Sequence, residues 1–114
     1  MGAASIILYA SRDFNIASII IDSPFAVLRE LCRELAASYK LIPSALANYM
    51  LEKVRGKVKE MMGFDLYGLN PINHSSQCRA PALFVHAIND ELIDISHMRR
   101  IYDAYGGDKS KIEI

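Results

Sequence analysis

Apolar and polar positions along the chain follow two different periods, separated by turn-forming residues. Short β-branched runs predict strands, whereas apolar residues spaced three and four apart predict helices. We therefore expect helices over residues 3–10, 24–38, 44–62 and 95–105, and strands over residues 17–21, 82–87 and from 111 onward. This order is typical of an α/β fold in which parallel strands alternate with helices.

The first two strands are predicted to be buried. Ile19, Ile20 and Ile21 follow one another between turn residues, which is the pattern of a central parallel strand covered on both faces. Residues 82–87, which follow Pro81, have the same apolar character. We therefore expect both strands to lie in the core of a sheet.

The helix after the first strand is predicted from a start signal and an apolar stripe. In Asp22-Ser23-Pro24, we expect Ser23 to accept hydrogen bonds from the first-turn amides and Pro24 to take the first helical position. The stripe follows at helical spacing and consists of Leu28, Leu31, Cys32 and Leu35.

The next helix is predicted to open near Pro43 and to end at Gly63, in the position of a left-handed cap. Its apolar side carries Leu46, Met50, Val54 and Val58. Its other side carries Glu52, Lys53, Arg55, Lys57, Lys59 and Glu60. Because acidic residues interleave with the basic ones, we interpret this side as solvated and not as a nucleic-acid patch.

Composition and charge exclude several classes of partner. The 13 basic residues balance the 13 acidic ones among 114, so no net charge attracts nucleic acid or an anionic membrane surface. No apolar run approaches the ~20 residues that cross a bilayer, and no segment resembles a signal peptide. Cys32 and Cys78 lack metal-ligand spacing, and we favour two reduced thiols over a disulfide. We expect one soluble, cytoplasmic domain without cofactor, metal or nucleic-acid partner.

The candidate chemistry follows the second buried strand. Residues 81–93, PALFVHAINDELI, place Asp90 beyond the carboxyl end of that strand, at the edge where open α/β sheets bind ligands. A carboxylate there can orient a histidine that takes a proton from a nucleophile. By position alone, Asp90 could as well form a turn or cap the next helix, with Asp94 as a competing cap.

The histidines are weighed as candidate catalytic bases. His86 lies within the strand, where a core imidazole hydrogen-bonded to a neighbour is the simplest interpretation. His74, in the long connection over residues 64–80, and His97, on the last helix, are most simply surface residues. Cys32 lies on an apolar stripe and is expected to be a buried, inert thiol.

Taken in order, these features resemble the C-terminal half of the α/β-hydrolase family, in particular its peptidase-like and acyl-protein thioesterase-like serine hydrolases. Met1-Gly2, followed by two alanines, resembles the end of a G-x-S-x-G nucleophile elbow that runs into its helix. Residues 22–25 resemble an Asp-Ser-Pro-Phe turn, and residues 90–93 resemble an Asp-x-x-Ile/Val box. The resemblance spans essentially all of the chain.

The resemblance implies a partial α/β-hydrolase fold without the N-terminal strands. Residues 1–114 would be the C-terminal portion of a single domain, with residues 26–63 as a helical excursion near the site. The activity implied is that of a serine hydrolase cleaving an ester, thioester or amide acyl bond of a small-molecule or acyl-protein substrate. Asp90 would be the acid of a Ser-His-Asp triad, and Met1 would supply a backbone N–H to the oxyanion hole. The serine would precede residue 1, and the histidine would follow Ile114.

A partial fold of this kind has consequences for the isolated chain. We expect it to be inactive, because it has neither the nucleophile nor the base. Apolar residues such as Ile6, Ile7, Leu8 and Ile19 would lack partners, so we expect the fragment to self-associate. The alternative function is a noncatalytic hydrolase-like interaction module. A Gly-x-Ser encoded upstream and a His encoded downstream would distinguish the two functions.

Overall fold

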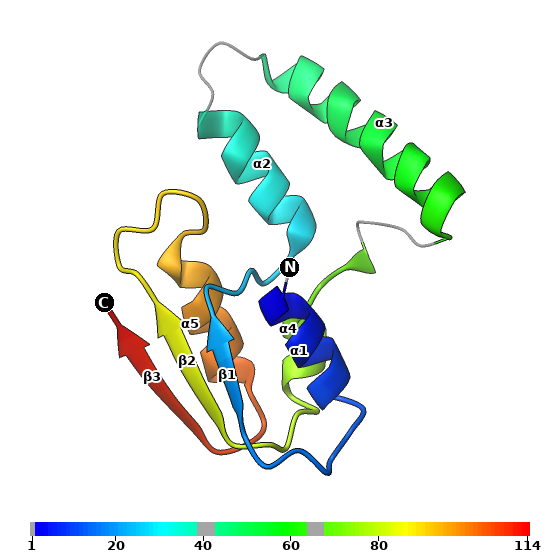
Figure 1. Cartoon of the computed structure of the whole chain (residues 1–114). Coiled ribbons are helices and arrows are strands. Elements are labelled where there is room, and N and C mark those ends of the chain that lie inside the picture. The colour runs from blue at the N-terminus through cyan, green and yellow to red at the C-terminus, as the bar shows by residue number, and fades with distance from the viewer. Residues whose placement is uncertain (1, 39–42, 64–67) are drawn as a thin grey trace. The chain divides into compact units, whose positions relative to one another are not determined.

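The computed structural model describes residues 2–38, 43–63 and 68–114 of the chain. These residues form two compact units. We call Met1–Ala26 together with Pro71–Ile114 the sheet unit, and Val27–Asn70 the helical unit. In the described part of the chain, all strands belong to the sheet unit (Figure 1).

A three-stranded parallel sheet forms the centre of the sheet unit. Its strands are β1 (Ile19–Asp22), β2 (Ala82–His86) and β3 (Lys109–Glu113), in the spatial order β1-β2-β3 (Figure 1). The register places Ile21 beside Phe84 and Phe84 beside Lys111. The predicted parallel α/β architecture is confirmed, although β1 begins at residue 19 instead of 17 and β3 begins at residue 109 instead of 111.

One face of the sheet is buried. Ile21, Phe84 and His86 point to this face and have no exposed surface. Helix α5 (Ile95–Ala104) contacts β2, and the rings of Tyr102 and Tyr105 stand edge-on to the ring of Phe84. Edge-to-face pairs of this kind add to the stabilisation that comes from burial of the rings. The core of the unit therefore lies between the sheet and its helices.

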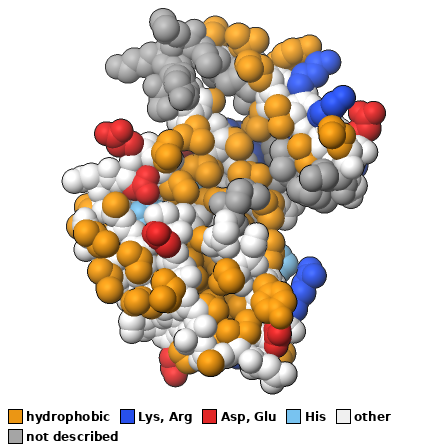
Figure 2. Space-filling view, viewed as in Figure 1, with side chains coloured by type: hydrophobic (Ala, Val, Ile, Leu, Met, Phe, Trp, Pro, Cys, Tyr) orange, Lys and Arg blue, Asp and Glu red, His pale blue; other side chains and the backbone are white. Residues whose placement is uncertain are grey.

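The opposite face of the sheet, which we call the open face, consists of Ile20, Leu83, Val85 and Ile112. Ile20 is 69% exposed and Ile112 is 49% exposed. Figure 2 shows apolar side chains at the surface over the strands. The prediction that residues 17–21 form a central strand covered on both faces is therefore wrong. In the described residues β1 pairs with β2 alone, and burial of a face requires an element packed against it.

Helix α1 (Gly2–Ala10) confirms the helix predicted over residues 3–10. Its buried residues are spaced three apart: Ala4, Ile7 and Ala10. It contacts β1 and the short helix α4 (Ile72–Ser75). The expected shortage of partners holds for Ile6, which is exposed, but not for Ile7 or Ile19, which are buried.

The turn after β1 differs from the prediction. Ser23 has a left-handed backbone with φ of 51°, and its hydroxyl donates to Asp22 Oδ1 at 2.9 Å instead of capping a helix. Helix α2 (Leu28–Ser38) begins four residues after Pro24, the predicted first helical position. The left-handed residue turns the chain away from the strand before the helix can start. Within the described residues this helix extends to Ser38.

The helical unit consists of α2 and α3 (Ser44–Met62), which contact each other. The end of α3 is confirmed: Gly63 has φ of 76°, and its N–H donates to the Lys59 carbonyl at 3.0 Å. The apolar stripe of α3 stays largely at the surface, with Leu46, Met50 and Val54 each about half exposed. In α2, Leu31 of the predicted stripe is buried.

The segment from Gly68 to β2, part of the predicted long connection, contains α4 and then runs beside the end of α5. The Gly106 N–H donates to the Ser75 carbonyl at 3.1 Å. A Cβ at Gly106 would collide with the Ser76 carbonyl oxygen, and one at Gly107 would lie 2.7 Å from the Arg79 carbonyl oxygen. These glycines therefore permit a close approach of two backbone segments. They do not cap α5, which ends at Ala104 with Tyr105 as its C-cap.

Candidate functional site

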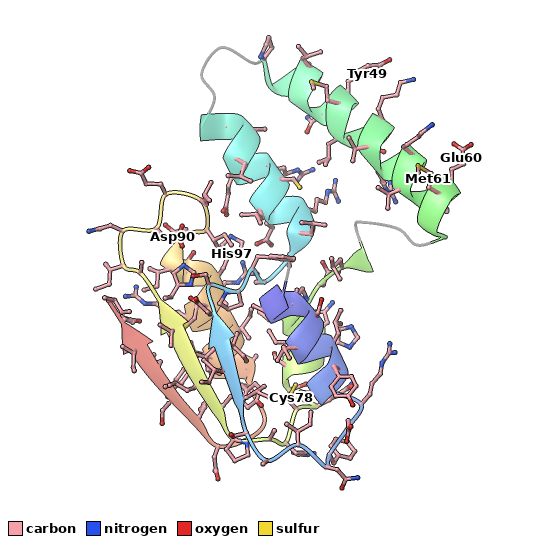
Figure 3. All side chains as sticks on the ribbon, viewed as in Figure 1. Tyr49, Glu60, Met61, Cys78, Asp90 and His97 are labelled. Atoms are coloured by element: carbon pink, nitrogen blue, oxygen red, sulfur yellow. The ribbon has the colours of Figure 1, made fainter. Side chains whose placement is uncertain are left out.

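The candidate site is the turn that follows β2, at the carboxyl end of the parallel strands. Asp90 lies on this turn (Figure 3), and its N–H donates to the Ala87 carbonyl at 3.3 Å. The side chain of Asp90 is 19% exposed, so its carboxylate reaches solvent from a largely covered position. This location agrees with the strand-end position predicted from the sequence.

Backbone amides hold one oxygen of the Asp90 carboxylate. Oδ1 accepts hydrogen bonds from the N–H groups of Leu92 and Ile93, both at 2.9 Å. The Ile93 hydrogen bond is the largest cause of a lowered Asp90 pKa, with smaller contributions from the Leu92 amide and from attraction to His86. Asp90 therefore remains a carboxylate at neutral pH, with its orientation fixed through Oδ1.

His86 contacts the same turn from the end of β2. The imidazole has no exposed surface, and its Nε2 lies 2.8 Å from the Ile93 carbonyl oxygen and 3.4 Å from Asp90 Oδ2. A carbonyl oxygen only accepts, so Nε2 carries the hydrogen of this bond. The interpretation of His86 as a core imidazole bonded to a neighbour is confirmed. Its contact with Asp90, four residues later, was not predicted.

The structure separates the two acidic residues that competed for the helix cap. Asp94 caps α5, because its Oδ1 accepts from the Ser96 N–H at 2.9 Å. Asp90 instead closes its own turn through Oδ1, as the turn-forming alternative required. The second oxygen of Asp90, Oδ2, lies 3.4 Å from His86 Nε2.

His97 corrects a sequence prediction. It is 1% exposed instead of lying at the surface, and its Nδ1 accepts a hydrogen bond from the Ala26 N–H at 3.1 Å. The same hydrogen bond ties α5 to the turn after β1. A signal was present in the sequence, because His97 lies four residues before the buried Ile101 and shares its side of the helix. His74, also predicted at the surface, is half-buried on α4.

The remaining candidates do not extend the site. Met1, predicted to supply an oxyanion-hole N–H, lies outside the described residues. Both cysteines are free thiols, and burial raises the pKa of Cys32 and of Cys78. A raised thiol pKa disfavours the nucleophilic thiolate, as expected for Cys32, although that residue is only partly buried.

Residues 2–38, 43–63 and 68–114 contain no group of three His, Cys, Asp or Glu side chains able to hold a metal ion. No helix among them is long and apolar enough to cross a membrane. A hollow of about 360 Å³ lies at the amino ends of the strands, lined by Ile20, Leu83 and Ser110 among others. That hollow is at the opposite end of the strands from Asp90.

Comparison with known proteins places this geometry in a wider fold. No protein-family model matches the chain. The uncharacterized protein YqkD of Bacillus subtilis (strain 168) is 33% identical over an alignment of 121 residues, gaps included. The alignment covers 96% of the chain and 36% of YqkD. The chain thus spans about a third of the length of this curated relative.

Solved structures identify the fold. An acetyl xylan esterase from Paenibacillus sp. R4 superimposes with a TM-score of 0.66 at 16% identity, over 98% of the chain and 35% of the esterase. An esterase of Pyrococcus furiosus has a TM-score of 0.66 at 18% identity, over 99% and 40% respectively. An acylaminoacyl peptidase of Pyrococcus horikoshii has a TM-score of 0.62 at 11% identity, over 99% and 18%. The chain therefore has part of the α/β-hydrolase fold, as its sequence predicted.

Proposed function

We propose that the chain is part of a serine hydrolase that cleaves an ester, thioester or amide acyl bond, and that Asp90 is the acid of its Ser-His-Asp triad. The observation that carries this proposal is the state of the Asp90 carboxylate at the end of β2. Its Oδ1 is held by two amides, and its side chain keeps 19% of its surface exposed. The esterases and the peptidase that share the fold support a hydrolase function.

The geometry suits the part that an acid takes in a triad. Such a carboxylate accepts a hydrogen bond from the ring Nδ1–H of the catalytic histidine, holds the productive tautomer and stabilises the imidazolium that forms. Two amide hydrogen bonds keep Asp90 ionised and prevent its rotation. Oδ2 is then the oxygen that would receive the histidine ring.

The other members of the machinery are proposed by resemblance. The nucleophilic serine would come immediately before Met1, on an elbow that leads into α1, and the base would follow β3. The N–H of Met1 would stabilise the oxyanion of the tetrahedral intermediate. We propose a small-molecule or acyl-protein substrate and a cytoplasmic location. The free state of both cysteines supports a reducing compartment.

The test is Asp90→Asn in the longer protein that carries this segment together with a nucleophile and a base. We expect kcat for p-nitrophenyl acetate to fall by up to ~10⁴-fold, because an amide cannot hold the productive histidine tautomer. The fold should persist, since the Asn oxygen still accepts from the amides at residues 92 and 93. Near-normal turnover would remove Asp90 from the mechanism.

Asp94→Asn is the matched control. It makes the same change four residues away, and asparagine caps helices about as well as aspartate. We expect this variant to retain both kcat and stability. An equal loss of activity in both variants would mean that the change acts through the whole turn instead of through the Asp90 carboxylate.

A second candidate function, a noncatalytic interaction module, is favoured by the open face. Ile20 and Ile112 expose about half or more of their surface there, beside a β1 edge that is unpaired in the described residues. Exposed apolar patches and strand edges promote association. We therefore propose that the isolated chain self-associates through this face.

Sedimentation at low micromolar concentration tests self-association. Ile20→Lys should weaken it about tenfold or more, because a charge replaces an isoleucine side chain that association would bury. Met61→Lys places the same charge on α3, at a residue that is also highly exposed, and should leave association unchanged. A wild-type chain that sediments as a monomer contradicts the proposal.

A further inference from the structure

Burial of the His86 imidazole in its present environment costs folding free energy. The ring is fully buried at the end of β2, and its Nδ1 has no hydrogen-bond partner among the residues that the structure describes. A buried polar atom without a partner destabilises a fold, and an apolar side chain of similar size would avoid that loss. Packing alone therefore does not account for a histidine at this position.

The other ring nitrogen makes the contacts that do account for it. Nε2 donates to the Ile93 carbonyl at 2.8 Å, and the Ile93 N–H donates to Asp90 Oδ1 at 2.9 Å. The two bonds engage the carbonyl and the N–H of Ile93. The His86 ring therefore holds Ile93 in place, and Ile93 in turn holds the Asp90 carboxylate. Nε2 also lies 3.4 Å from Asp90 Oδ2, close enough for direct attraction.

We propose that His86 is a positioning residue for Asp90. From the end of β2 it holds the turn over residues 90–93 in the conformation that directs the Leu92 and Ile93 amides at Oδ1. The catalytic consequence rests on the proposed triad. The positioning itself does not, because it concerns atoms of this chain alone.

The test is an NMR titration of the Asp90 carboxyl in the 114-residue chain, with three variants. His86→Phe keeps a ring but removes the N–H donor, and it should raise the Asp90 pKa toward the ordinary value of an aspartate. His86→Gln carries an amide N–H that reaches the position of Nε2, and it should restore the low pKa. His74→Phe, on α4, makes the same substitution away from the turn and should change nothing.

A structural role without positioning predicts a different result. In that case His86→Phe would alter stability but leave the Asp90 pKa as in the wild type, and this outcome overturns the proposal. Should His86→Phe fail to fold, two other measurements decide. Nitrogen NMR of the wild-type ring must find the hydrogen on Nε2, and His86→Gln must retain the low Asp90 pKa. Hydrogen on Nδ1 alone, or a raised pKa in His86→Gln, overturns the proposal.

These measurements are independent of catalysis. If Asp90→Asn leaves the activity of the longer protein unchanged, the triad proposal fails while the coupling of His86 to Asp90 can still be observed. If Asp90→Asn abolishes activity but His86→Phe leaves the Asp90 pKa unchanged, the triad stands and the positioning role is rejected.

Discussion

The sheet unit and the helical unit use the same helical periodicity with different results. In α5, the residues at helical spacing, Ile95, Met98 and Ile101, are buried. In α3, Leu46, Met50 and Val54 have similar spacing, yet each stays about half exposed. Periodicity therefore determines that a helix has an apolar side. Whether that side is buried depends on a second surface that is available to cover it.

The two units also differ in their polar groups. In the sheet unit, buried or partly buried groups such as His86, His97 and Asp90 are bonded to backbone atoms of distant or turn residues. In α3, by contrast, Arg55 contacts Glu52, three residues earlier on the same helix, at 3.4 Å. Exposed local pairs contribute little to stability, whereas partly buried networks fix geometry. The candidate chemistry accordingly lies in the sheet unit.

The largest effect on stability is expected from Phe84→Ala. Phe84 is fully buried and lies against the rings of Tyr102 and Tyr105, so its removal leaves a cavity and should cost about 3–5 kcal/mol in the free energy of unfolding. Tyr49→Ala in α3, where the ring is exposed, is the control and should cost less than about 1 kcal/mol. Urea denaturation measures both. Equal losses would eliminate the contrast between the units.

Two glycine-to-alanine substitutions, one in each unit, should change the free energy of unfolding in opposite directions. Gly106→Ala places a methyl group against the Ser76 carbonyl oxygen. This should destabilise the chain by roughly 1–3 kcal/mol, because the atoms that the methyl group meets belong to the backbone and cannot turn aside as a side chain can. Gly56→Ala in the middle of α3 meets nothing within 4 Å and should stabilise that helix by about 0.5–1 kcal/mol. Thermal unfolding monitored by circular dichroism tests both signs. A tolerated Gly106→Ala would contradict the close approach at the end of α5.

The smallest effect is expected in acid. Two hydrogen bonds from Arg99, at 2.8 and 3.0 Å, lower the pKa of Glu113 to about 2. Because the pKa is lowered on folding, the ion pair stabilises the chain above the ordinary pKa of a glutamate, and this contribution is lost as the pH falls toward 2. Glu113→Gln should flatten the dependence of the unfolding midpoint on pH between about 4.5 and 2. An unchanged slope would show that this surface pair has no influence on the acid transition.

The position of Asp90 could be predicted from the sequence because it depends on one strand and the turn after it. A buried apolar run from residue 82 predicts β2, and the carboxyl end of a parallel strand is where a functional carboxylate is expected. The choice of Asp90 oxygen that accepts the two turn amides, and the contact of Asp90 with His86, could not be predicted. Both depend on the path of residues 87–93, which propensities do not specify.

His97 shows a second kind of gap between the sequence and the structure. The period of α5 contained the information that its side chain faces inward, but its polar ring favoured the surface. Burial became acceptable because the Ala26 N–H, 71 residues earlier, supplies a hydrogen bond to Nδ1. Only the fold brings that donor to the helix.

The sequence by itself determined the types of the elements and their order, the end of α3 at Gly63 and the place of Asp90 after β2. Each of these depends on residues close together in the chain, whose periodicity and backbone preferences act locally. The tertiary structure alone decided which face of β1 is covered and which backbone groups His86 and His97 bond to. Those outcomes depend on partners that are distant in sequence, because a polar or apolar group gains or loses free energy according to what packs against it.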